Sequence, residues 1–505
     1  METLMTASST DDRTAPPLAM ALTPLVVAIA SISLMIYMFQ GESLGGPVQL
    51  ALIFSAALAA GLALARGERF ATLKAGIFEG INVSMNAIVI ILLVGGLIGV
   101  WILSGIVPSM IYYGSFLVSG DAFYFSACLI CAIIAVSIGS SLTTAGTIGL
   151  ALITIAESVG LSTAVTAGAI ISGSYFGDKL SPLSDTTNLS AAVSGGELFL
   201  HIKAMSRTVF LSLAASLALY WLIGLMTTDA SDNLSRIAEL RTMLEANFVI
   251  SPLLIAPLLV VLVLAYRKVD AIPTLFIGLL MGALAAMLWQ TDNALRLAAA
   301  SDNTLFPVIE GVVRAISTGY VSTTGDAHFD RILSKGGMFG MLYMLWLVVA
   351  AMSFGGIMAS AGFLRRLVET MTRRAKTPGA LVLSTHLACL TTLMLTGSQY
   401  MGNILPGRMF KEKYEELGLA PENLSRALED ASTVVSPLIP WTTCGAFLTA
   451  TLGVPTLIYA PFTFFSLINL LLAITCAVLG LNMLRNANIR PQPTSSQQSG
   501  HTHHA

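Results

Sequence analysis

The chain has 505 residues, of which 55% are hydrophobic and 11% charged, and its mean hydropathy is +0.80. Because soluble domains carry about 25% charged residues, this composition excludes a soluble globular protein and indicates a polytopic membrane protein. The formal net charge is −2, and no basic run suggests a nucleic-acid partner. Cys128-x-x-Cys131 lies in an apolar stretch without a second pair at zinc spacing, so neither a metal centre nor a cofactor is expected.

Ten apolar runs are long enough to cross a bilayer as helices, which need about 20 residues each. Before them, residues 1–17 lack the basic segment and the cleavage site of a signal peptide and are expected to form a disordered cytoplasmic tail. The runs are 18–40, 46–66, 84–106, 121–138, 205–226, 249–266, 271–290, 338–360, 379–396 and 458–482. The segments 139–196 and 397–453 are apolar but interrupted by Gly, Ser, Thr and Pro, so simple spans are not expected there. The polar residues 485–505 are expected to form a second disordered tail.

Positive charge orients these spans, because cytoplasmic loops are enriched in Lys and Arg. Counting spans places on one side the basic residues of 66–74, 201–207, 267–268, 365–376 and 485–490. We therefore expect both termini in the cytoplasm. The basic residues between 408 and 426 fall on the other side by this count, and a folded hairpin in place of a free loop would account for them.

The most polar stretch at membrane depth is 173–190, which contains Asp178, Lys179, Pro182 and Asp185. An unsatisfied polar group in hydrocarbon costs several kcal/mol, so a lipid-facing helix cannot hold these residues. We therefore expect a broken transmembrane helix whose unwound middle lines a hydrated cavity. Pro182 has no N–H and its ring displaces the carbonyl of Asp178, which frees a backbone oxygen beside a carboxylate. Hard cations favour such oxygen-rich sites.

Short motifs of the first half recur in the same order in the second half. Gly-Gly at 95–96 recurs at 355–356, Gly-Ser at 139–140 recurs at 397–398, and Ser-Pro-Leu at 181–183 recurs at 436–438. Glu-Gly at 79–80 recurs at 310–311 with a shorter offset, which implies an insertion in the second half around 321–337. The span count sends the Gly95 helix outward and the Gly355 helix inward. The pattern therefore predicts an all-α secondary transporter with inverted repeats, re-entrant hairpins and broken helices that meet at the midplane.

These features divide the chain into six parts. They are the tail 1–17, N-terminal transmembrane helices 18–74, a first repeat 75–227, linking transmembrane helices 228–303, a second repeat 304–484 and the tail 485–505. In each repeat a hairpin tip precedes a broken helix, and the expected tip residues are Ser140, Thr143, Thr144, Ser398 and Asn403. Pro437 and Pro440 break the second helix and free the carbonyls of Thr433 and Ser436. In this alignment Asp178 matches Thr433, and Asp185 matches Pro440.

Asp178 and Asp185 are the candidate Na⁺ and proton ligands, because carboxylates inside a membrane are usually functional. The alternative is a carboxylate that pairs with Lys179 or that caps a half-helix. Lys179 is either a partner that tunes a neighbouring carboxylate or a cavity-edge residue that reaches water. Glu429 and Asp430 are either a second proton site or a hairpin cap. The candidate neutral ligands, each of which can instead serve as a helix–helix contact, are Ser184, Thr186, Thr187, Asn188, Ser436 and Thr443.

The stretches 175–188, 398–400, 405–409 and 423–445 resemble the NhaC family of sodium/proton antiporters. The resemblance covers most of the chain between about 20 and 480. It implies a bacterial inner-membrane exchanger of a superfamily whose members use inverted repeats with hairpins and often form dimers, so a homodimer is an expected partner. The family also includes members that resemble sodium-lactate/proton-malate exchangers.

The leading hypothesis is therefore exchange of Na⁺ for H⁺ at one site to which both halves contribute residues. A carboxylate holds either a proton or Na⁺, and an empty charged site is costly to move across the bilayer, so only the loaded site moves. The alternative is exchange of a small organic anion coupled to Na⁺ and H⁺, received by the N-termini of the half-helices. Neither broken stretch has an arginine at its centre to hold such an anion. No His-Glu-x-x-His motif occurs, and an enzyme is not expected.

Overall fold

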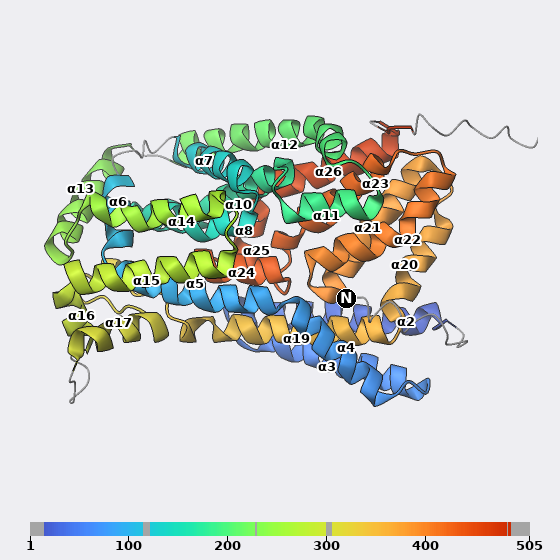
Figure 1. Cartoon of the computed structure of the whole chain (residues 1–505), viewed down its shortest axis with the longest axis horizontal. Helices are drawn as coiled ribbons and strands as arrows, with labels where there is room; N and C mark the ends of the chain where they lie inside the picture. Colours follow the sequence, from blue (N-terminus) through green and yellow to red (C-terminus); the bar gives the residue numbers. More distant parts are fainter. Residues whose placement is uncertain (1–14, 115–121, 228–229, 299–305, 482, 486–505) are drawn as a thin grey trace, which may run out of the picture.

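The computed structural model describes residues 15–114, 122–227, 230–298, 306–481 and 483–485. Within these ranges every named element is a helix (Figure 1). Eight of the described helices are long and apolar enough to cross a membrane, or ten if each of two bent pairs forms one span. The predicted all-α polytopic class is confirmed. The predicted tails lie outside the described residues except for 15–17 and 485, and so do the predicted boundaries at 228 and 303–304.

The helices follow the predicted runs, with additional short or polar helices between them. In the first half they are α2 (Leu18–Phe39), η1 (Gln40–Gly45), α3 (Pro47–Ala65), α4 (Phe70–Val83), α5 (Met85–Leu103), α6 (Ile106–Gly114), α7 (Phe123–Ile138), α8 (Ser141–Thr144), η3 (Ala145–Gly149), α9 (Leu150–Ser158), α10 (Thr163–Leu180), α11 (Asp185–Ser194) and α12 (Leu198–Thr227). The linking helices are α13 (Ala230–Asn247), η4 (Pro252–Ile255), α14 (Ala256–Tyr266), α15 (Ala271–Trp289) and α16 (Thr291–Ala298). In the second half they are α17 (Pro307–Ser317), α18 (Ala327–Leu333), η5 (Phe339–Met341), α19 (Leu342–Ser360), α20 (Phe363–Arg374), α21 (Pro378–Thr396), α22 (Gln399–Glu416), α23 (Pro421–Leu428), η6 (Glu429–Thr433), η7 (Ser436–Leu438), α24 (Thr443–Leu452), α25 (Thr456–Tyr459), η8 (Ala460–Phe462) and α26 (Phe464–Leu479).

Both predicted hairpins turn at their Gly-Ser pair. Gly139 takes a left-handed conformation (φ 76°) that ends α7, and the Ser140 hydroxyl caps α8. Gly397 (φ 62°) ends α21 in the same way, and Ser398 caps α22. The repeated doublet is thus a helix stop followed at once by a helix start.

In each hairpin, the start of the first arm and the end of the second arm lie at the same end of the molecule. In the first hairpin, the Tyr124 hydroxyl near the start of α7 accepts a hydrogen bond from the N–H of Ser162, just after α9 (3.0 Å). In the second, Gly379 at the start of α21 packs against Ala477, while Ala420 just after α22 donates to the carbonyl of Leu484 in the same segment (2.9 Å).

The broken helices connect the two halves. α10 and α11 are separated by 181–184, and α23 with η6 is separated from α24 by a longer irregular stretch. α11 contacts α22 and α23 of the second half, whereas α24 contacts α8, η3 and α9 of the first half. This reciprocal contact between each broken helix and the other half's hairpin confirms the predicted inverted-repeat architecture (Figure 1).

The repeated Gly-Gly doublets mark close backbone contacts. The N–H of Gly337 donates to the carbonyl of Gly95 in α5 (2.6 Å), so the segment before α19 lies against α5. Gly356 of α19 packs against the backbone of Gly76 in α4, the helix before α5, and leaves no room for a Cβ atom. At its Gly-Gly doublet, α5 therefore packs against the segment before α19, and α19 packs against α4, the helix before α5.

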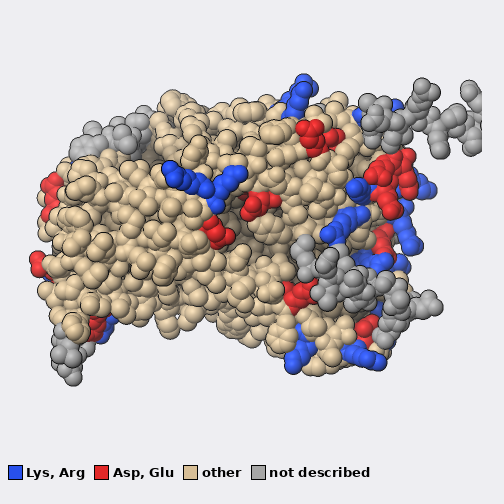
Figure 2. Space-filling view, in the orientation of Figure 1, with Lys and Arg blue, Asp and Glu red and all other residues tan. Residues whose placement is uncertain are grey.

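The structure accounts for the basic residues that disagree with the span count. α20, which carries Arg365 and Arg373, contacts both α21 and α22, so Arg408 and Lys411 of α22 lie at the same end of the molecule as the arginines of α20. Figure 2 shows Lys and Arg gathered at this end together with Asp and Glu, a smaller charged group near the middle of the face, and long uncharged stretches elsewhere. A re-entrant hairpin, not a crossing helix, therefore brings these residues back to the basic side.

Candidate functional site

A cavity of about 460 Å³ lies where the two hairpin tips and the two broken helices meet. Residues of both halves and of the α14–α15 turn line it. They include Ser140, Thr143, Leu183 and Asp185 from the first half, Ser398, Gln399, Tyr400 and Thr443 from the second half, and Lys268 and Asp270 from the turn. The central prediction, that the two breaks face each other, therefore agrees with the structure.

In each half the tip glycine rests on the residues that precede the second half-helix. A Cβ atom at Gly139 would lie 2.7 Å from atoms of Leu183. The carbonyl of Gly397 accepts a hydrogen bond from the N–H of Thr443 (2.9 Å). Because both glycines also need positive φ, a larger residue at either position would separate a tip from its break.

Asp185 and Asp178 occupy successive depths below the cavity. Asp185 is the first residue of α11 and is exposed on the cavity wall, a position that also suits the dipole of α11. Asp178 is buried at the end of α10 and accepts a hydrogen bond from the Ser141 hydroxyl (2.7 Å). The Ser184 side chain is also within hydrogen-bonding reach of Asp178, and the two carboxylates interact electrostatically.

The carbonyls freed by proline are not open ligands, which corrects the expectation from the sequence. The carbonyl of Asp178 accepts hydrogen bonds from the N–H of Ser181 (3.2 Å) and the hydroxyl of Thr187 (3.4 Å). That of Ser436 accepts from the hydroxyl of Thr442 (2.6 Å). Since buried carbonyls need a donor, neighbouring hydroxyls replace the lost backbone bonds, and the carboxylates remain the principal oxygen ligands.

The candidate neutral ligands divide into two groups. Thr443 lines the cavity together with the tip residues Ser140 and Thr143. The others do not line the cavity, and their side chains bond within the protein: Ser184 to Thr186 (3.1 Å), Thr187 to backbone carbonyls, Asn188 to the carbonyls of Pro182 and Ser184, Ser436 to Gln399 (3.1 Å), and Thr144 to the carbonyl of Ser140. Asn403 is buried inside α22 and donates to the Thr433 hydroxyl (3.2 Å), so it is not at the hairpin tip.

The structure changes the predicted correspondence between the halves. Asp185 begins α11, and Thr443 begins α24, directly after the capping residues Ser184 and Thr442. Asp185 therefore corresponds to Thr443 and not to Pro440. The motif alignment is wrong here because the second break is longer than the first.

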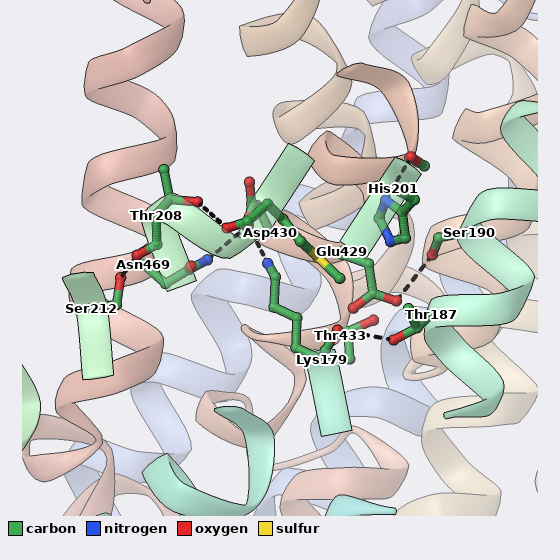
Figure 3. A network of polar contacts seen from close by, with 12 residues as sticks. Lys179, Thr187, Ser190, His201, Thr208, Ser212, Glu429, Asp430, Thr433 and Asn469 are labelled. Carbon is green, nitrogen blue, oxygen red and sulfur yellow. Dashed lines mark hydrogen bonds and ion pairs between the residues drawn. The ribbon is translucent and has the colours of Figure 1, made fainter. Parts of the chain in front are cut away.

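Lys179 and Asp430 form a buried ion pair between the two halves (Figure 3). The Asn469 amide also donates to Asp430 (2.8 Å). Lys179 is thus not a cavity-edge lysine that reaches water. Asp430 and Glu429 lie in a single π-helical turn and not at a hairpin cap. Figure 3 shows Glu429 directed toward Ser190 of α11, whose hydroxyl donates to Oε1 (3.1 Å).

Residues 173–481 match the Na+/H+ antiporter family. The chain is 36% identical to the Na(+)/H(+) antiporter NhaC of Alkalihalophilus pseudofirmus over 412 residues, which are 81% of this chain and 86% of that protein. It is 32% identical to the Na(+)/H(+) antiporter NhaC of Bacillus subtilis, covering 84% of this chain and 90% of that protein. It is 33% identical to a malate-2H(+)/Na(+)-lactate antiporter of Bacillus subtilis, covering 86% and 90%.

The chain belongs to the Na⁺/H⁺ antiporter family. This confirms the resemblance to NhaC proteins drawn from the sequence and identifies a multi-pass membrane transporter. The predicted homodimer and the predicted domain boundaries stay predictions.

Sequence reasoning missed several residues at the site of this antiporter. Ser141 follows the repeated Gly-Ser pair directly, and that position could have pointed to it. Lys268 and Asp270 belong to a short linker with no counterpart among the repeated motifs. Lys268 is the non-glycine residue of the described chain with positive φ (60°), a strained conformation that is common at functional sites and that sequence does not reveal.

Proposed function

We propose that this antiporter exchanges Na⁺ for H⁺ across a bacterial inner membrane, at one site formed by Asp178 and Asp185, with its basic end in the cytoplasm. The observation that carries the proposal is the shared cavity, in which tips and breaks from both halves surround the exposed Asp185 and the buried Asp178 lies behind it.

The groups around this site suit a small hard cation. Two carboxylates and the hydroxyls of Ser141 and Ser184 supply oxygen ligands, which Na⁺ prefers over nitrogen or sulfur. Na⁺ at these carboxylates disfavours a proton bound among the same group of acids, so binding of one displaces the other. The charged, empty site is costly to enclose in a low-dielectric interior, and only the loaded transporter changes its access.

The charges of the cavity favour a cation over an organic anion. Asp185 and Asp270 line it together with a single described lysine, Lys268. Lys179, which from sequence alone could have received a carboxylate, is already paired with Asp430. One relative is named a malate-2H(+)/Na(+)-lactate antiporter, so anion exchange remains the second candidate and is included in the test.

The test is a Na⁺ jump on proteoliposomes that contain the purified antiporter, with internal pH recorded by a fluorescent dye. Na⁺ alone should drive proton efflux, and malate or lactate should leave the rate unchanged. Absence of proton flux without an organic anion, and its appearance when malate or lactate is added, would overturn the proposal in favour of the second candidate. Empty liposomes control for leakage.

A further inference from the structure

Glu429 is a buried carboxylate that the proposed Na⁺ site does not use. Its side chain is fully buried. The residue belongs to the π-helical turn η6, and such turns often occur at functional positions. Oε1 accepts one hydrogen bond, from Ser190, and Oε2 has no hydrogen-bond partner in the described part of the chain. A permanently charged carboxylate with a bare buried oxygen would be expensive, which points to a bound proton.

The three acids differ in their access to the cavity. Asp185 is exposed and lines the cavity, Asp178 is buried beside Ser141 of the hairpin tip, and Glu429 is buried with no exposed surface. Asp185 acts electrostatically on Asp178, and Asp178 acts on Glu429. These interactions cross from the first half to the second, since Asp178 belongs to α10 and Glu429 to η6.

The charges near Glu429 leave it without a counter-ion of its own. The Lys179 ammonium acts on Glu429, but it forms its ion pair with Asp430, which also receives the Asn469 amide. The remaining titratable groups packed around the turn act on Asp430, and they are His201 of α12, His386 of α21 and Arg426 of α23. The Lys179–Asp430 pair is already neutral, so among the described groups the charge of an ionised Glu429 is not compensated unless the carboxyl group is protonated or a cation such as Na⁺ binds nearby at Asp178.

We propose that Glu429 carries the transported proton on a site separate from the Na⁺ ligands Asp178 and Asp185. This inference rests on the proposed Na⁺/H⁺ exchange and adds a location for the proton. On arrival of Na⁺, the proton leaves the Glu429 carboxyl group through Asp178 to water in the cavity. One positive charge departs as one arrives, so the net charge of the buried group of acids is the same in both loaded states.

The test compares Glu429→Gln with wild type in proteoliposomes, because glutamine keeps the shape of a protonated glutamate and cannot release a proton. Na⁺-driven proton flux should fall about 100-fold or more, while exchange of external ²²Na⁺ for internal Na⁺ should continue and become independent of pH. Glu422→Gln, which neutralises another buried acid two turns earlier, should keep both activities. Size-exclusion chromatography confirms that each variant is folded.

A second readout does not depend on transport. Addition of Na⁺ to wild-type protein should remove an infrared C=O stretching band of a protonated carboxyl group, and this change should be absent in Glu429→Gln and present in Glu422→Gln. Wild-type proton flux in Glu429→Gln, or the same Na⁺-induced loss of the infrared band in this variant as in wild type, would overturn the inference and leave Na⁺/H⁺ exchange intact. A wild-type protein without Na⁺-driven proton flux would instead refute the proposed function itself.

Discussion

The Lys179 ammonium and the Asp430 carboxylate form an ion pair with exposed fractions of 0% and 1%, and each belongs to a different half of the chain. Lys179 lies one residue after the proposed ligand Asp178, and Asp430 one residue after Glu429. The pair therefore fixes the position of both acids relative to each other.

Breaking this pair on one side should destabilise the protein strongly. Lys179→Met leaves a buried carboxylate without its cation, which costs about 3–5 kcal/mol. The double variant Lys179→Met, Asp430→Asn should recover most of that loss, as measured by thermal unfolding in detergent. Lys335→Met, which removes the partly exposed pair with Glu157, should cost less than about 1 kcal/mol. Equal losses of stability on breaking the two ion pairs would show that the buried pair does not hold the two halves together.

Neutralising Asp185 should abolish exchange without unfolding the protein, because this side chain is exposed on the cavity wall. Asp270→Asn is the matched control and should keep most of the flux, since Asp270 lines the same cavity but is not one of the proposed Na⁺ ligands and caps α15 through the N–H of Ile272 (2.9 Å), a role that asparagine also fills. Na⁺-driven proton flux in proteoliposomes measures both. Retained flux in Asp185→Asn would remove this residue from the site.

A methyl group at either tip glycine should cost more than at an ordinary helix end. Gly453 has positive φ and open space around it, so Gly453→Ala should cost only the left-handed conformation, about 1–2 kcal/mol. Gly139→Ala and Gly397→Ala should add about 1–3 kcal/mol for overpacking, against Leu183 of the first break at Gly139 and against the Met352 side chain and the Trp441 carbonyl at Gly397, and should slow exchange. Unfolding in detergent checks the stability, and the three variants should rank accordingly. Equal effects at all three positions would contradict the proposed contact between tips and breaks.

The inserted loop before α19 should loosen in acid. Desolvation opposes ionisation of Asp330, but hydrogen bonds from Thr324, Ser322 and Gly325 hold the pKa of this carboxyl group below its ordinary value of 3.8. Its contribution to loop stability is therefore complete above the unfolded pKa and is lost as the pH falls through the folded one. The protection factors of amide hydrogen exchange over 321–337, which correct for the intrinsic pH dependence of exchange, should fall below about pH 4.

The variant Asp330→Asn should show the same fast exchange at neutral pH. Asp292→Asn, in the first turn of α16, is the control and should leave the loop protected. Protection of the loop that is independent of pH in wild type would show that Asp330 does not hold it.

The sequence predicted those features that have a local cause. Gly-Ser predicted both hairpin turns because left-handed glycine and a capping serine act within a few residues. The partner of Lys179 could not be predicted, because Asp430 lies in the other half of the chain. From the sequence, the nearby acids Asp178 and Asp185 were equally plausible partners. The hydrogen bond that the Ser436 carbonyl accepts could not be predicted, because the Thr442 hydroxyl reaches this carbonyl only in the folded break. Asp185 was matched to the wrong residue because the two breaks differ in length.

The reciprocal contact of α11 with α22 and of α24 with α8 has a consequence for the single chain. Either half alone would leave its broken helix without the hairpin that covers it. Because both halves are joined in one chain, the two equivalent positions can carry different residues, and one holds Asp185 while the other holds Thr443.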